Sequence, residues 1–143
     1  MTVHNISSLF WHSKRVLVSG HTGFKGSWLS LWLQSMGADL CGVALPPPTE
    51  PSLFDQAKVS DGMRHKIVDI RNFEEVDCVF QSFRPEIVIH MAAQPLVRLS
   101  YQEPIQTYAT NIMGTVHILE ASRRAKSVRA IVNVTTDKCY ENR

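Results

Sequence analysis

The sequence predicts a doubly wound α/β fold built on a parallel sheet. Two observations support this prediction: short apolar runs rich in β-branched residues alternate with segments of helical period, and a cluster of three glycines directly follows the first run. Strands that alternate with helices pair in parallel through right-handed crossovers. The residues that follow each strand therefore meet at one edge of the sheet, where ligands of such folds bind.

The predicted strands and helices follow from these patterns in chain order. Strands are expected at residues 15–19, 40–44, 66–69, 87–91 and 130–134. Helices are expected from the glycine cluster to Gly37, at about 73–83 with a capping box from Asn72 to Glu75, and from about 104 to 125, with a helical turn at 52–57 after the proline-rich loop 46–51. Trp28 and Trp32 lie one helical turn apart, so we expect them to pack in the core or in an interface.

Composition limits the class of protein. The chain has 143 residues, 44% hydrophobic and 20% charged, which suits one globular domain; we expect an N-terminal extension over residues 1–13 and a domain over 14–143. A net charge of +2 without long basic runs argues against binding to nucleic acid or to an anionic membrane. No membrane-spanning segment and no signal peptide are predicted, so we expect a cytoplasmic protein. Its three widely spaced cysteines predict reduced thiols and no metal site.

The glycine cluster is the first candidate site. Gly20, Gly23 and Gly26 follow a strand and open a helix, where a tight turn and the helix N-terminus can accept a pyrophosphate. A purely structural strand-to-helix joint is the alternative. Asp39 precedes the second strand and so lies at the wrong edge for a ribose, whereas Asp69 at the end of the third strand is better placed for the adenine side. No arginine follows the second strand to receive a 2′-phosphate, which mildly favours NAD over NADP.

Five segments, in order, resemble the extended short-chain dehydrogenase/reductase family, whose members act on sugar nucleotides. They are residues 20–27, 69–71, 90–94, 111–115 and 135–138. The resemblance implies a Rossmann-like domain that binds NAD. The residues that it places at the cofactor are Gly20, Thr22, Gly23, Phe24, Lys25, Gly26, Asp69, Ile70, Ala92, Ala93, Gln94 and Asn111.

Three stretches resemble one branch of this family, the dehydratases that take CDP-glucose. They are Phe-Lys-Gly-Ser-Trp-Leu from residue 24, Gln-Pro-Leu-Val-Arg from residue 94, and Thr136-Asp137-Lys138, where dehydratases of dTDP-glucose carry Thr-Asp-Glu. The substrate implied is a nucleotide sugar, CDP-glucose. Another nucleotide-sugar dehydratase or an epimerase of the same family, or a stand-alone dinucleotide-binding module, stays open as an alternative.

The resemblance also implies a reaction and its catalytic residues. The sugar is oxidised at C4, water leaves across C5 and C6, and hydride returns to C6 to give a 4-keto-6-deoxy sugar. Thr136 would bond the C4 oxygen, Asp137 would protonate the departing C6 oxygen, and Lys138 would take the C5 proton or stabilise the enolate. A polar turn after the fifth strand is the alternative.

Further polar residues follow the fourth strand. Arg98, Ser100 and Tyr101, expected in a loop there, are candidates for substrate contact, with surface placement equally open. Asn111 in the long helix is expected to mark a helix bulge or to contact the cofactor, with solvent exposure as the alternative. His90 ends an apolar strand, so we expect a hydrogen-bonded core histidine without a chemical role.

One expected element is missing from the sequence. The family's base is a tyrosine in Tyr-x-x-x-Lys, but Tyr101 and Tyr108 are each followed four residues later by isoleucine, and Tyr140 lies too near the end. We therefore expect this chain to be the N-terminal part of a longer homo-oligomeric dehydratase, with the C-terminal half absent and the isolated chain inactive.

Overall fold

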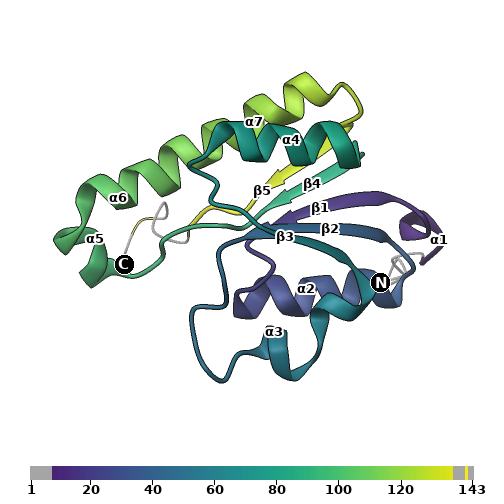
Figure 1. Ribbon diagram of the computed structural model, residues 1–143, viewed down its shortest axis with the longest axis horizontal. Helices are drawn as coiled ribbons and strands as arrows, with labels where there is room; N and C mark the ends of the chain where they lie inside the picture. Colours follow the sequence, from purple (N-terminus) through teal and green to yellow (C-terminus); the bar gives the residue numbers. More distant parts are fainter. Residues whose placement is uncertain (1–7, 137–140, 142–143) are drawn as a thin grey trace.

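Five strands form one parallel sheet in the computed structural model, which describes residues 8–136 and 141 (Figure 1). The strands are β1 (Arg15–Ser19), β2 (Asp39–Ala44), β3 (Arg64–Ile67), β4 (Ile87–His90) and β5 (Ala130–Asn133), in the spatial order β3-β2-β1-β4-β5. Every pairing is parallel. The chain runs outward from β1 to β3 and then returns to place β4 beside β1, so the topological switch point lies between these two strands. The predicted doubly wound fold is confirmed.

Helices cover both faces of the sheet, with α4, α6 and α7 on one side and α2 and α3 on the other (Figure 1). The helical segments are α1 (Ser8–Trp11), α2 (Phe24–Ser35), α3 (Leu53–Gln56), the 3₁₀ segment η1 (Val59–Gly62), α4 (Phe73–Phe83), α5 (Val97–Gln102), α6 (Pro104–Tyr108), the π-helical segment η2 (Ala109–Met113) and α7 (Gly114–Ala125). Within residues 8–136, none of these helices has the length and apolar character needed to cross a bilayer.

The alternation of side chains along the central strands creates two hydrophobic cores. Leu17 of β1 and Val88 of β4 point into the core beneath α4 and α7, together with Phe80 and Ile118 from those helices. Val16, Val18, Leu40, Ile87 and Ile89 point to the other face, where Leu33 of α2 meets them. Because β1 and β4 are buried on both faces, their central residues, 16–18 and 87–89, are all apolar, the pattern from which these strands were predicted.

Helix α2, which follows the glycine turn, packs on the sheet through small residues. Gly26, Ser27, Ser30 and Leu33 are its buried positions. Trp28 and Trp32 instead are 57% and 53% exposed, so the expectation that they pack in the core is wrong. Small residues let the helix approach the sheet closely, and the tryptophans then fall on its outer surface. Their alternative role in an interface stays a prediction.

The first and last residues of some strands and helices differ from the prediction where the sequence has no clear hydrophobic pattern. β3 begins at Arg64 and ends at Ile67, earlier than predicted, because this edge strand exposes all of its side chains and lacks an apolar pattern. Asp69 therefore follows the strand. The helix expected over 104–125 is confirmed as consecutive helical residues, with π-helical geometry at 109–113. Asn72 caps α4, since its Oδ1 accepts the N–H of Glu75.

A histidine from the glycine turn fills the space between β2 and the segment that follows it. The His21 ring is fully buried, and a Cβ on Gly42 of β2 would overlap it. Phe54 of α3 and His65 of β3 lie 5.4 and 5.7 Å from it, measured between ring centroids. Neither His21 nitrogen makes a hydrogen bond of normal geometry to the described residues. Burial, aided by His65, lowers the His21 pKa to about 4, and the Val43 carbonyl opposes only part of that shift.

The buried His21 ring predicts a loss of stability in mild acid. The unfolded chain protonates this imidazole near pH 6.5, whereas the folded chain does so only near pH 4, so stability falls as the pH drops through this window. Because of His21, the free energy of unfolding should fall by about 2 kcal/mol when the pH is lowered from about 7 to about 5. Urea unfolding at both pH values measures this loss, which should be smaller in His21→Asn. His12→Asn, which removes an exposed ring, should keep the wild-type loss; equal losses in all three proteins would contradict the assignment.

Candidate functional site at the carboxyl edge of the sheet

The turn after β1 brings the backbone against itself at two glycines. Gly20 has a φ of +79°, and a Cβ there would lie 2.8 Å from the backbone nitrogen of Ala92. A Cβ on Gly26 would overlap the carbonyl oxygen of Gly20. Both positions therefore require glycine for the fold itself, because no side chain fits where the turn passes the loop after β4 and the first turn of α2.

Gly23 differs from the other two glycines. It caps α2 with an extended backbone, and a Cβ there would meet only the Gly20 carbonyl oxygen, at an ordinary 3.4 Å. The packing of the chain thus leaves room at Gly23, and no side chain caps the helix there. The first N–H groups of a helix lack intrahelical acceptors and carry its positive dipole end. The space above Gly23 can therefore accept an anionic group.

The second strand contributes backbone but no acid at this edge. The Thr22 hydroxyl donates to the carbonyl of Leu45, 2.9 Å away, and so ties the turn to the end of β2. Asp39 opens β2 at the opposite edge and lies 3.5 Å from Arg64 in an ion pair, as expected of an acid unable to reach this site. The run that follows β2, Leu-Pro-Pro-Pro, thus offers no carboxylate at this edge.

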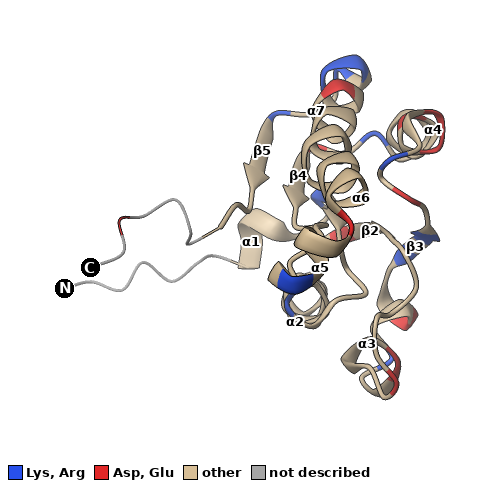
Figure 2. Cartoon of the chain, turned by 90° about the vertical axis from the view of Figure 1, so that its left-hand side faces the viewer, with Lys and Arg blue, Asp and Glu red and all other residues tan. Residues whose placement is uncertain are grey.

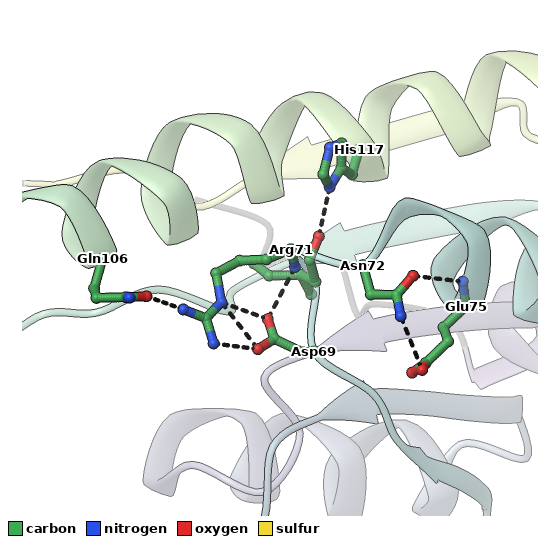
Figure 3. A network of polar contacts seen from close by, with 7 residues as sticks. Asp69, Arg71, Asn72, Glu75, Gln106 and His117 are labelled. Atoms are coloured by element: carbon green, nitrogen blue, oxygen red, sulfur yellow. Dashed lines mark hydrogen bonds and ion pairs between the residues drawn. The ribbon is translucent and has the colours of Figure 1, made fainter.

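Asp69 is held by an arginine that the sequence argument gave no role. The Arg71 Nε lies 3.0 and 2.9 Å from the two Asp69 carboxylate oxygens, and the Arg71 backbone N–H donates to Oδ1 at 2.9 Å (Figure 3). These hydrogen bonds hold the Asp69 pKa below its usual value. Arg71 Nη1 also donates to Gln106 of α6. The pair therefore presents a fixed, ionised carboxylate, and the Asp-x-Arg spacing is the sequence signal that could have revealed it.

Ile70 faces the core rather than the open edge. Its side chain is buried and lies against Gly114, where a Cβ would overlap it. The Ile70 carbonyl accepts a hydrogen bond from Nδ1 of His117 at 2.9 Å (Figure 3). Only backbone atoms of Ile70 are thus placed to meet a ligand at this edge.

The loop after β4 is clamped by Asn111 of the π-helical segment. Gln94 N–H donates to Asn111 Oδ1 at 2.8 Å, and Asn111 Nδ2 donates back to the Gln94 carbonyl at 3.0 Å. The Gln94 side chain donates to the Thr107 hydroxyl at 3.0 Å. Of the two expectations for Asn111, the helix bulge is confirmed, and its side chain holds the loop that contains Ala92 and Ala93. Asn111 is half-buried, so solvent exposure does not describe it.

Arg98, Ser100 and Tyr101 lie on α5, so the expected loop is wrong. The segment folds as a short helix because the backbone bonds of one turn form directly after Leu96, whose carbonyl accepts the Ser100 N–H. Tyr101 is 84% exposed, and Arg98 lines a shallow depression with its helix neighbours. Among the described residues, no hydrogen bond or ion pair joins these three side chains to the glycine turn.

The remaining candidates follow β5. Thr136 is exposed and lies three residues beyond the end of that strand, at the same edge of the sheet as the glycine turn. Asp137 and Lys138 lie outside the described residues. Within the described part of the chain, acidic and basic residues are spread over several elements (Figure 2), and no three His, Cys, Asp or Glu gather in a metal-binding arrangement.

Known proteins are similar to this chain in both sequence and fold. The family model for GDP-mannose 4,6 dehydratase matches residues 17–142. CDP-glucose 4,6-dehydratase of Salmonella typhimurium is 59% identical over 96% of this chain. The UDP-glucose 4-epimerase of Stenotrophomonas maltophila, solved with bound NAD and formylated UDP-arabinopyranose, is 25% identical and superposes with a TM-score of 0.80 over 91% of this chain and 39% of its own. That of Thermus thermophilus, solved with NAD, is 31% identical with a TM-score of 0.71 over 81% of this chain and 36% of its own.

The chain spans 38% of the length of the Salmonella enzyme. The family model nevertheless covers nearly all of the residues present, from β1 to beyond β5. The chain therefore belongs to the GDP-mannose 4,6 dehydratase family.

Proposed function

We propose that this chain binds NAD at the carboxyl edge of its sheet, with the pyrophosphate above Gly23. The observation that carries the proposal is the room at Gly23, which the packing of the protein does not need and which lies at the uncapped N-terminus of α2. Two structural relatives that share the fold were solved with NAD. The alternative of a purely structural joint accounts for Gly20 and Gly26 but gives no reason for glycine at Gly23.

The proposed contacts follow from the layout of the edge. Backbone N–H groups of the first turn of α2, beside Gly23, would hold the pyrophosphate, with Lys25 adding positive charge and Thr22 and Phe24 shaping the turn. Asp69 would accept from the adenine or its ribose, beside the Ile70 backbone. Ala92 and Ala93 would let the nicotinamide half pass over the end of β4, and Asn111 would act through Gln94. NAD is favoured over NADP because no arginine follows β2.

We further propose that the chain is part of a dehydratase of CDP-glucose. Its 59% identity to the Salmonella CDP-glucose enzyme exceeds the 32% to the dTDP-glucose dehydratase of Neisseria meningitidis and the 31% to the UDP-glucose epimerase of Mycolicibacterium smegmatis. NAD would supply reversible hydride transfer. The name of the family model, GDP-mannose 4,6 dehydratase, agrees with the removal of water from a nucleotide sugar.

In that reaction the residues after β5 would act on the sugar. The Thr136 hydroxyl would hydrogen-bond the C4 oxygen and guide its proton. Asp137 would give a proton to the C6 oxygen as water leaves, and Lys138 would accept the C5 proton or stabilise the enolate. Arg98, Ser100 and Tyr101 would contact the nucleotide sugar from α5. We propose that the whole protein is a homo-oligomer in the cytoplasm. Its product would serve O-antigen synthesis.

Gly23→Ala should separate cofactor binding from folding. The added Cβ fits the protein, so the melting temperature should stay near that of the wild type, whereas NAD affinity should fall about tenfold or more because the methyl group occupies the pyrophosphate space. Isothermal titration calorimetry measures the affinity. Trp32→Phe, an exposed change on the same helix, should leave it unchanged. Unchanged affinity in Gly23→Ala and in the bulkier Gly23→Val would contradict the proposed site.

A hybrid enzyme tests the substrate. Residues 1–143 would replace the matching part of the Salmonella CDP-glucose 4,6-dehydratase, and we expect the hybrid to convert CDP-glucose to its 4-keto-6-deoxy product because the two sequences agree at 59% of positions. Product formation is followed by chromatography and mass spectrometry.

The control hybrids carry Asp137→Asn or Lys138→Ala, and each should lose about a hundredfold or more in turnover if these residues transfer protons. GDP-mannose, dTDP-glucose and UDP-glucose serve as competing substrates. A folded hybrid that binds NAD yet prefers one of these over CDP-glucose would refute the substrate assignment and leave the cofactor proposal standing.

A further inference from the structure

His90 lies at the end of β4, beside Ser19 at the end of β1, and is only 2% exposed. The sequence predicted a hydrogen-bonded core histidine, which is confirmed. Its two ring nitrogens reach in different directions: Nδ1 lies 2.5 Å from the Ser19 hydroxyl, and Nε2 lies 2.9 Å from the hydroxyl of Thr115 in α7. His90 thus bridges two segments of the candidate site that are far apart in sequence.

The proton on each group of this bridge follows from its partners. The Ser19 hydroxyl accepts the N–H groups of Met91 and Ala92, at 3.0 and 3.2 Å, and the Met91 N–H is shared with the Ser19 carbonyl at 3.2 Å. The proton of the hydroxyl goes to His90 Nδ1, 2.5 Å away. Nδ1 is therefore an acceptor, and Nε2 carries the proton that goes to Thr115 Oγ1.

Beyond His90, the hydrogen bonds continue with the same donor-to-acceptor direction. The Thr115 hydroxyl, having accepted from His90, donates its proton to the carbonyl of Asn111 at 2.8 Å. Only the neutral His90 ring with its proton on Nε2 satisfies every group, because protonation of Nδ1 would leave two donors facing each other. Burial also lowers the His90 pKa, which favours the neutral ring.

The bridge joins the three segments on which the proposed cofactor site depends. Ser19 immediately precedes Gly20, and its hydroxyl holds the N–H groups of Met91 and Ala92. Thr115 fixes the carbonyl of Asn111, whose side chain clamps Gln94. The loop after β4 is therefore anchored at both ends, at its start by the Ser19–His90 pair and at its end by Asn111.

We propose that His90, in its Nε2–H tautomer, is a positioning residue that holds loop 91–94 against the glycine turn at the distance NAD requires. This inference rests on the proposed NAD site and deepens it. His90 is buried, so it acts through Ser19 and Thr115 rather than by contact with the cofactor. An imidazole suits the role because it is rigid and offers one donor and one acceptor on opposite sides of a ring.

A matched pair of substitutions tests the proposal in the full chain. Thr115→Val keeps the shape of the side chain but removes the hydroxyl, whereas Thr115→Ser keeps the hydroxyl. Hydrogen exchange of the Met91 and Ala92 amides reports on the loop, NAD titration reports on the cofactor, and ¹⁵N NMR of the wild-type ring reports on the His90 tautomer.

We expect Nδ1 of His90 to be unprotonated in the wild type. Thr115→Val should speed amide exchange at Met91 and Ala92 and weaken NAD binding about tenfold, as expected when a buried hydrogen-bonded pair is lost. Thr115→Ser should restore both to within about twofold of the wild type. This rescue would not occur if Thr115 served only as packing volume, because serine is smaller than valine.

Three results would overturn the proposal. They are a ring protonated at Nδ1, a Thr115→Val variant with wild-type exchange and NAD affinity, and a Thr115→Ser variant as impaired as Thr115→Val. If the wild-type chain does not bind NAD at all, the proposed function fails, and with it the cofactor part of this inference. The exchange rates and ring signals would then still decide whether His90 holds the loop.

Discussion

The close crossing of backbone at the end of β1 determines the rest of this edge of the protein. Gly20 passes the backbone of Ala92 and the first turn of α2 so closely that a Cβ on either Gly20 or Gly26 would overlap main-chain atoms. This crossing brings the N-terminus of α2 and the loop after β4 to the same place. Because neither contact tolerates a side chain, the geometry of the turn is fixed by the fold. Gly23, between them, is free of that constraint and faces the space where we place the pyrophosphate.

The long helical run α6–η2–α7 organises the opposite side of the same edge. It contacts the segment after β3 through Gln106 and His117 (Figure 3). It also contacts the loop after β4 through Asn111 and the last residue of β4 through Thr115. The π-helical turn lies where these contacts concentrate, which agrees with the frequent occurrence of π-bulges at functional sites. A single helical run thus sets the positions of the segments after β3 and β4 relative to each other, and the turn after β1 is the third segment at this edge.

The sequence predicted the parts of this fold that depend on burial. The centres of β1 and β4 are apolar because both faces are covered, and α4 could be predicted from its cap at Asn72. Prediction failed where tertiary contacts override local pattern. The tryptophans of α2 were expected in the core or in an interface, but close packing through Gly26 and its serine neighbours leaves them on the surface of this chain and excludes the core. β3 is an exposed edge strand, so its limits left no periodic signal.

Candidate site residues were predicted individually, whereas their partners were not. Asp69 was recognisable, but the hydrogen bond from its partner Arg71 to Gln106 joins positions 35 residues apart and cannot be deduced without the fold. The same holds for His90, whose partners Ser19 and Thr115 come from β1 and α7. Hydrogen bonds between distant segments depend on the final packing, and a sequence motif identifies only one of the two bonded residues.

The most direct test of the account is amide chemical-shift mapping of the ¹⁵N-labelled chain during titration with NAD. Binding at the carboxyl edge predicts shifts concentrated at Gly20–Gly26, at Asp69 and Ile70, and at residues 91–94, with little change at the exposed edge strand β3. Shifts confined to α5 or to the opposite edge of the sheet, or no shifts at millimolar NAD, would contradict the assignment of this edge as the cofactor site.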